Sequence, residues 1–138
     1  MTTANRPQKL PKDIEQKLID EAFKALKNSH SPHSKFRVGA AILGKSGRIY
    51  PGTNIEFDAF SLTVCAERAA LFGAISSGEK EFKAIAIATG SEEFKFPCGL
   101  CRQALVEFNP KLKVILITKN KEIKRFILKD IIPNYLKL

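Results

Sequence analysis

The sequence predicts an α/β fold of three layers, in which a mixed sheet of about five strands carries helices on both faces. Segments with helical periodicity alternate along the 138 residues with short apolar runs of strand length. The chain is also 44% hydrophobic, which matches one globular domain with a single core. We therefore expect one domain that spans residues 1–138.

The expected elements follow from periodicity and from turn residues. Residues 13–28 repeat apolar side chains at steps of three and four, which predicts an amphipathic helix. Residues 36–43 and 48–55 predict two strands around a hairpin-sized turn at 44–47. Residues 65–75 are rich in alanine and leucine and predict a largely buried helix. The remaining expected elements are strands at 82–89, 112–118 and 123–128 and a helix at 98–108.

The amino-terminal residues and the charge bear on location and partners. Residues 1–12 are polar and contain prolines, so we expect a flexible extension with no secretory signal. The longest apolar runs are far shorter than the roughly 20 residues that cross a bilayer. We expect a cytoplasmic protein with no membrane partner. Because the charges behind the net +9 are scattered, we attribute them to composition and do not expect nucleic acid as a partner.

The three cysteines indicate a metal site. Cys98 and Cys101 lie three residues apart at the start of a predicted helix, so their side chains share one face. Cys65 begins another predicted helix, and two helix amino termini would stabilise thiolates. Three thiolates and one zinc ion carry a net negative charge, which Arg68 or Arg102 could balance by hydrogen-bonding the sulfurs.

Glu67 indicates the chemistry at that metal. Three protein ligands leave one tetrahedral position open, as in a catalytic zinc site. Glu67 follows Cys65 by two residues and can act as a general base without occupying the metal. The combination matches the signature of zinc deaminases, which predicts a hydrolytic deamination.

Four motifs resemble the short, homotetrameric cytidine deaminases. They are Phe36-Arg-Val-Gly-Ala-Ala41, Asn54-Ile-Glu56, Cys65-Ala-Glu-Arg68 and Pro97-Cys-Gly-Leu-Cys-Arg-Gln103, and the resemblance covers roughly residues 13–135. It implies the fold of that family, one zinc ion per subunit and a homotetramer with shared active sites. It also implies a hydrolase that converts cytidine and deoxycytidine to uridine and deoxyuridine in pyrimidine salvage.

The resemblance assigns roles to residues that match the motifs. Phe36 would stack on the pyrimidine, and Asn54 with Glu56 would hydrogen-bond the ribose 3′-hydroxyl. Ala66 and Glu67 would contact the base. The segment from Phe57 to Phe60 departs from the family pattern, since Asp58 adds a charge and Phe60 lacks a tyrosine hydroxyl. The tail also departs from the family pattern, since Asn134 and Tyr135 follow Ile131-Ile-Pro133 where the family often has a two-residue spacer and phenylalanine, and Tyr135 is a candidate lid over the site.

Other functions fit parts of the sequence. The altered segment after Glu56 is compatible with another cytosine nucleoside such as blasticidin S, and the +9 charge with cytosine in RNA. In a non-catalytic zinc module, His30 or His33 would close the site as a fourth ligand. That module would leave no open metal position.

Overall fold

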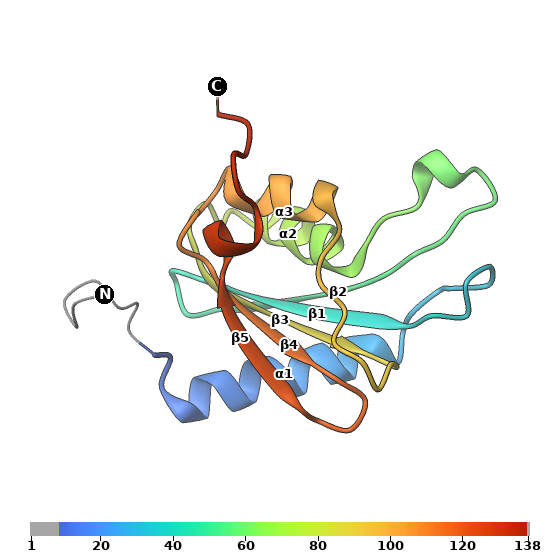
Figure 1. Cartoon of the computed structure of the whole chain (residues 1–138), viewed down its shortest axis with the longest axis horizontal. Helices are drawn as coiled ribbons and strands as arrows, with labels where there is room; N and C mark the ends of the chain where they lie inside the picture. Colours follow the sequence, from blue (N-terminus) through green and yellow to red (C-terminus); the bar gives the residue numbers. More distant parts are fainter. Residues whose placement is uncertain (1–8, 138) are drawn as a thin grey trace.

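A computed structural model describes residues 9–137 and confirms the predicted architecture (Figure 1). A five-stranded sheet has the order β2-β1-β3-β4-β5. Strand β3 runs parallel to β4, and the other neighbouring pairs are antiparallel. The elements are α1 (Lys12–Leu26), β1 (Val38–Gly44), β2 (Ile49–Thr53), η2 (Phe60–Leu62), α2 (Ala66–Ser76), β3 (Phe82–Thr89), α3 (Gly99–Val106), β4 (Lys113–Ile117), β5 (Ile123–Ile127) and η3 (Leu128–Ile131).

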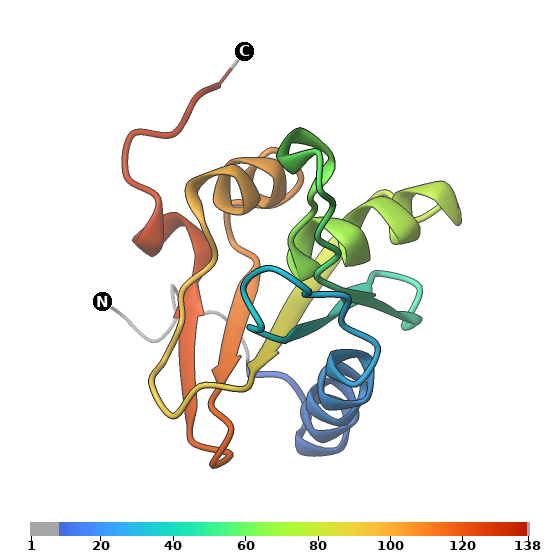
Figure 2. The same cartoon turned by 90° about the vertical axis from the view of Figure 1, so that its right-hand side faces the viewer.

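The helices form a layer on each side of the sheet. Helix α1 covers one face, and α2 and α3 cover the other (Figures 1 and 2). Strand β3 shows why, because its alternate side chains reach different layers. Ala84 and Ala86 pack in the cluster under α1, whereas Ile85 and Ile87 pack in the cluster under α2 and α3. A strand buried on both faces is apolar throughout, which is the pattern visible in the sequence.

Two glycines allow the helices to lie close to the strands. A Cβ atom at Gly39 in β1 would lie 2.1 Å from the carbonyl oxygen of Ala22 in α1. A Cβ atom at Gly52 in β2 would lie 2.3 Å from the amide nitrogen of Ala70 in α2. Both separations are shorter than any carbon contact permits, so these positions require glycine. Gly52 thereby fixes the distance of α2, and of the residues at its start, from the sheet.

The structure corrects one expectation and leaves one untested. Helix α2 is buried only on its inner face, since Phe72 and Ile75 remain 49% and 37% exposed. Its alanine and leucine content therefore does not mean burial all around. Of the expected extension at residues 1–12, residues 1–8 lie outside the described residues, and α1 already begins at Lys12.

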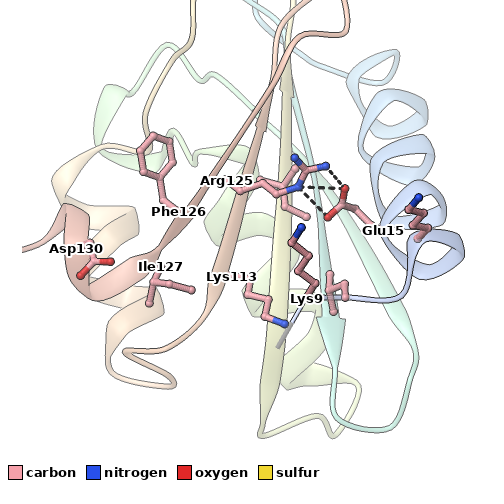
Figure 3. A pocket seen from close by; sticks show the side chains of 10 residues that line it. Lys9, Glu15, Lys113, Arg125, Phe126, Ile127 and Asp130 are labelled. Atoms are coloured by element: carbon pink, nitrogen blue, oxygen red, sulfur yellow. Dashed lines mark hydrogen bonds and ion pairs between the residues drawn. The ribbon is translucent and has the colours of Figure 1, made fainter. Parts of the chain in front are cut away.

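An ion pair joins the first turn of α1 to strand β5. The guanidinium of Arg125 donates from Nε and Nη2 to the carboxylate of Glu15, and the Nη2–Oε1 distance is 2.5 Å (Figure 3). The pair lies in a pocket of about 500 Å³ that also contacts Lys113, Phe126 and Ile127. None of the helices in residues 9–137 has the length and apolar content needed to cross a lipid bilayer.

Candidate metal centre and active site

The three cysteines meet at the amino-terminal ends of α2 and α3. Cys65 is the residue before α2 and Cys98 the residue before α3, whereas Cys101 lies in the first turn of α3. The Sγ atoms of Cys65 and Cys98 are 3.7 Å apart, and those of Cys98 and Cys101 are 3.4 Å apart. All three sulfurs lie within 4.8 Å of one another. The predicted convergence of two chain segments is therefore confirmed.

The sulfur spacing fits a tetrahedral zinc ion. Zinc–sulfur bonds of about 2.3 Å place sulfur ligands about 3.8 Å apart in a tetrahedron. One of the thiols, Cys65, is also electrostatically prepared for deprotonation. The pKa of Cys65 falls to about 5 because Cys101 donates a hydrogen bond to it and Arg68 lies beside it. The pKa of Cys101 is raised by that same hydrogen bond and by burial, so the first negative charge settles on Cys65.

The two arginines have different surroundings. Arg68 in α2 donates from Nη2 to the Cys65 sulfur at 3.4 Å, and its pKa is raised by that contact. Its Nε is buried and has no hydrogen-bond partner among the described residues. Arg102 instead donates to the carbonyl oxygens of Pro97 and Ile131, at 2.7 and 2.6 Å. Of the two candidates, Arg68 is the cation at the sulfurs and Arg102 joins α3 to η3.

Glu67 is a buried carboxyl beside the cysteines. It lies in the first turn of α2 and is 5% exposed. Burial raises its pKa, and the charge of Cys65 raises it further. Ala66, the other predicted base contact, is fully buried at the start of the same helix. The structure thus holds an acid with a strong affinity for protons next to the sulfur cluster.

Asn54 makes side-chain hydrogen bonds to three residues near the expected substrate site. It follows β2 and is 9% exposed. Its Oδ1 accepts hydrogen bonds from the Val38 amide and the Ser29 hydroxyl, and its Nδ2 donates to the Phe36 carbonyl at 2.7 Å. Phe36 is partly buried just before β1. Asn54 therefore fixes the backbone that carries Phe36, a structural role that the sequence did not indicate.

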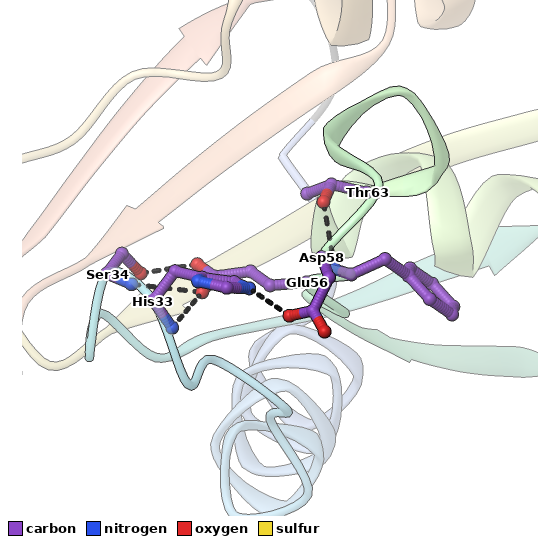
Figure 4. Close-up of polar contacts among 6 residues, drawn as sticks. His33, Ser34, Glu56, Asp58 and Thr63 are labelled. Carbon is purple, nitrogen blue, oxygen red and sulfur yellow. Dashed lines mark hydrogen bonds and ion pairs between the residues drawn. The ribbon is translucent and has the colours of Figure 1, made fainter.

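Glu56 is held by a loop that sequence analysis did not connect with it. Its Oε1 accepts the amides of His33 and Ser34 at 2.9 and 3.0 Å, and its Oε2 accepts the Ser34 hydroxyl (Figure 4). These bonds, the Ser34 hydroxyl first, lower the pKa of Glu56. Glu56 is consequently a fixed carboxylate. It borders a pocket of about 210 Å³ with His33, Phe60 and Thr63.

The other predicted residues lie elsewhere. Within residues 9–137, the group of side chains able to hold a metal consists of the three cysteines and includes neither His30 nor His33. His33 contacts Asp58 instead. This arrangement gives no support to a Cys₃His module. Tyr135 packs against the core cluster under α2 and α3 of its own chain.

Comparison with known proteins agrees with this geometry. A family model described as the cytidine and deoxycytidylate deaminase zinc-binding region matches residues 12–118, which include all three cysteines. The cytidine deaminase of Sporosarcina psychrophila is 44% identical over 122 residues, 88% of this chain and 89% of the relative. The cytidine deaminase of Halalkalibacterium halodurans is 40% identical over 119 residues, 86% and 90% of the two chains.

Solved structures show the same fold. The crystal structure of cytidine deaminase from Burkholderia pseudomallei superimposes with a TM-score of 0.84 at 34% identity, covering 88% of this chain and 98% of that one. The structure of cytidine deaminase from Mycobacterium tuberculosis gives 0.78 at 32% identity, covering 90% and 98%. With its sulfur cluster inside the matched region, the chain belongs to the zinc-dependent cytidine and deoxycytidylate deaminase family.

Proposed function

We propose that this protein hydrolyses cytidine and deoxycytidine to uridine and deoxyuridine with release of ammonia. The observation that carries the proposal is a buried carboxyl, Glu67, beside three converging sulfurs, which is the number of protein ligands that a catalytic zinc ion has. The 44% identity to a cytidine deaminase supports cytosine nucleosides as substrates.

The chemistry divides between the metal and the protein. Zinc bound by Cys65, Cys98 and Cys101 supplies a Lewis acid that makes water a better nucleophile near neutral pH. Glu67 accepts one proton from the water that attacks C4 of the cytosine and passes it to ring nitrogen N3. It then accepts the second proton, from the new C4 hydroxyl, and passes it to the amine, so that the C4–N bond breaks and ammonia leaves. Its raised pKa suits both steps, because a carboxyl that readily binds a proton can hold it between transfers.

The remaining residues orient the nucleoside. Phe36 stacks on the pyrimidine ring, and Ala66 contributes a backbone contact to the base. Glu56 accepts a hydrogen bond from the ribose 3′-hydroxyl, and Asn54 completes that contact. Glu56 is suited to this role because the loop at 33–34 fixes its orientation before substrate arrives.

Replacement of the proton carrier tests the mechanism. In Glu67→Gln, kcat for cytidine is expected to fall by about 10²- to 10⁴-fold, the usual range for loss of a general acid–base group. Bound zinc, measured by metal analysis, should stay near one ion per chain. The control is Glu122→Gln, an exposed carboxylate near β5. Undiminished turnover in the zinc-loaded Glu67 variant would refute the assigned role.

The active protein is a homotetramer whose sites are completed between subunits. Support comes from large apolar side chains left exposed on one chain: Phe60 and Leu62 in η2, Phe72 in α2 and Leu100 in α3 are 74%, 62%, 49% and 68% exposed. Exposed apolar groups in this number are typical of an interface. Light scattering on the purified protein is expected to give the mass of four chains.

Pyrimidine salvage in the cytoplasm is the expected context. Three free thiols that must remain reduced to bind zinc suit a reducing compartment. A panel of cytidine, deoxycytidine and blasticidin S, followed by the loss of cytosine absorbance, checks the substrate. If the protein deaminates blasticidin S but not cytidine, the substrate is blasticidin S and not cytidine.

A further inference from the structure

Two surface segments meet beside Glu56 through a histidine and an aspartate. One is the loop of residues 29–35, and the other, here called the arm, is residues 57–63. The Nε2 atom of His33 in the loop lies 3.1 Å from Oδ1 of Asp58 in the arm (Figure 4). The ring of His33 also meets the ring of Phe60 edge-on, with centroids 5.6 Å apart.

His33 contacts Glu56 by its main chain and the arm by its side chain. Its backbone amide donates to Glu56 Oε1 at 2.9 Å, and the amide of the next residue, Ser34, donates to the same oxygen at 3.0 Å. Backbone bonds at His30 extend this pairing, since its amide donates to Asn54 and its carbonyl accepts from Glu56. The position of the loop therefore sets the orientation of the Glu56 carboxylate.

The arm has few other polar anchors. Ile55 and Val64 close its base by two backbone hydrogen bonds of 3.0 Å, and the Phe57 amide donates to Thr63 Oγ1 within the arm. Among residues 9–137, no other side-chain hydrogen bond or ion pair joins the arm to the loop. The arm and loop project from the same end of the sheet, where Figure 1 shows both on the right. Within one chain, the His33 side chain, through its contacts with Asp58 and Phe60, thus sets how the loop and the arm lie against each other.

We infer that Asp58 and His33 are a positioning pair that sets how tightly Glu56 binds a hydroxyl on the sugar of the substrate. The inference rests on the proposed function, in which Glu56 accepts the ribose 3′-hydroxyl. Asp58 fixes the imidazole, the imidazole fixes the loop, and the loop amides fix the carboxylate. The charge that Asp58 adds to the arm therefore acts on the sugar and not on the reacting base.

The kinetic signature follows from where the pair acts. We expect the sugar hydroxyl, which does not react, to be held equally in the bound substrate and in the transition state. Loss of such uniform binding raises KM and leaves kcat unchanged. Exposed ion pairs have modest coupling energies, and Asp58 is fully exposed in the single chain. We expect KM for cytidine to rise about two- to five-fold in Asp58→Ala.

The experiment pairs a protein change with a substrate change. Steady-state kinetics of wild type and Asp58→Ala are measured with cytidine and with 3′-deoxycytidine, which lacks the hydroxyl. The rise in KM should occur with cytidine and vanish with 3′-deoxycytidine. Asp58→Glu, which keeps the charge, should restore most of the affinity for cytidine. The double variant with His33→Ala should bind cytidine no more weakly than His33→Ala alone, because the histidine substitution already removes the Asp58 contact together with the ring contact to Phe60.

A matched control separates this effect from loss of any surface ion pair. Glu81 pairs with Lys45 at 2.9 Å at the opposite end of β1, and Glu81→Ala should leave both KM values unchanged. An equal rise in KM with both substrates, a fall in kcat, or a changed assembly mass in Asp58→Ala would overturn the inference. Wild type that does not deaminate cytidine at all would instead refute the proposed function.

Discussion

At the scale of single residues, Arg68 is the cation in contact with the cysteine cluster. Three thiolates and a zinc ion would sum to one negative charge, and the Arg68 guanidinium, which donates to the Cys65 sulfur, is placed to neutralise it. Because the sulfurs lie at two helix amino termini, the positive ends of both helix dipoles add to this effect. One cation and two helices thus favour the deprotonated state that zinc requires.

Replacement of Arg68 should weaken metal binding. We expect Arg68→Gln to lower zinc affinity about 10- to 100-fold, the usual loss when a group that supports a ligand is removed. Arg68→Lys keeps the positive charge but lacks the planar guanidinium with its several donors, so we expect an intermediate affinity for zinc. Competition against a coloured chelator measures this without any assay of activity. Arg48→Gln, which removes an exposed guanidinium, should bind zinc as wild type does.

At the scale of elements, the contact of α2 with β2 depends on Gly52. The first turn of α2 carries Glu67, and Cys65 precedes it, so the distance between helix and strand sets where both lie. An added methyl group at Gly52 would meet the backbone of Ala66 and Ala70, which cannot move aside as a side chain could.

Two alanine substitutions should therefore have opposite effects. Gly52→Ala is expected to lower the free energy of unfolding by about 1–3 kcal/mol, as overpacked cores do. Gly73→Ala, in an exposed turn of α2 where an added Cβ meets nothing within 4 Å, should raise it by about 0.5–1 kcal/mol. Urea denaturation followed by circular dichroism measures both. A stable Gly52→Ala protein with unaltered zinc affinity would contradict the packing argument.

Elements with strong local patterns could be predicted from the sequence. The bounds of β3 at 82–89 follow directly from an apolar run, and the cysteine spacing identifies the metal ligands. The helix expected at 98–108 ends at Val106, because the residue before Pro110 disfavours helical geometry and the chain turns earlier. The exposed face of α2 could not be predicted, because a helix rich in alanine and leucine does not show by its composition which of its faces packs against the core.

Contacts between distant loops were not predictable. Ser34 and Glu56 are 22 residues apart, and they meet only because the turn after α1 pairs with the chain after β2. Nothing in the residues near Ser34 indicates a carboxylate partner. The same holds for His33 and Asp58, which the sequence presents only as a candidate metal ligand and as an added charge.

At the scale of the whole molecule, the Glu15–Arg125 pair connects α1 with the far edge of the sheet. The hydrogen bond from Arg125 lowers the pKa of Glu15 below its ordinary value of 4.5. The ionised carboxylate is therefore bound more tightly in the folded chain than in the unfolded one. Its stabilisation is complete above about pH 4.5 and disappears as the pH falls through the lowered pKa.

This linkage predicts a stability difference that depends on pH. At pH 7, Glu15→Gln should unfold more easily than wild type by about 0.5–1 kcal/mol, a modest value because Arg125 is more than half exposed. The free energies of unfolding of the two proteins should become equal in acid, below the lowered pKa of Glu15. Denaturant titrations at pH 7, 5 and 3 measure the gap, and a constant gap at all three values would contradict the linkage.

The separation of the cysteines along the chain also orders events during synthesis. Cys65 and Cys98 are 33 residues apart, and strand β3 lies between them. While only the part of the nascent chain before Cys98 has left the ribosome, the single exposed thiol is that of Cys65. One thiol is too few to retain an ion. We expect metal capture to wait until β3 is made and Cys98 and Cys101 have emerged, so a product that terminates before Cys98 presents too few sulfurs to hold zinc.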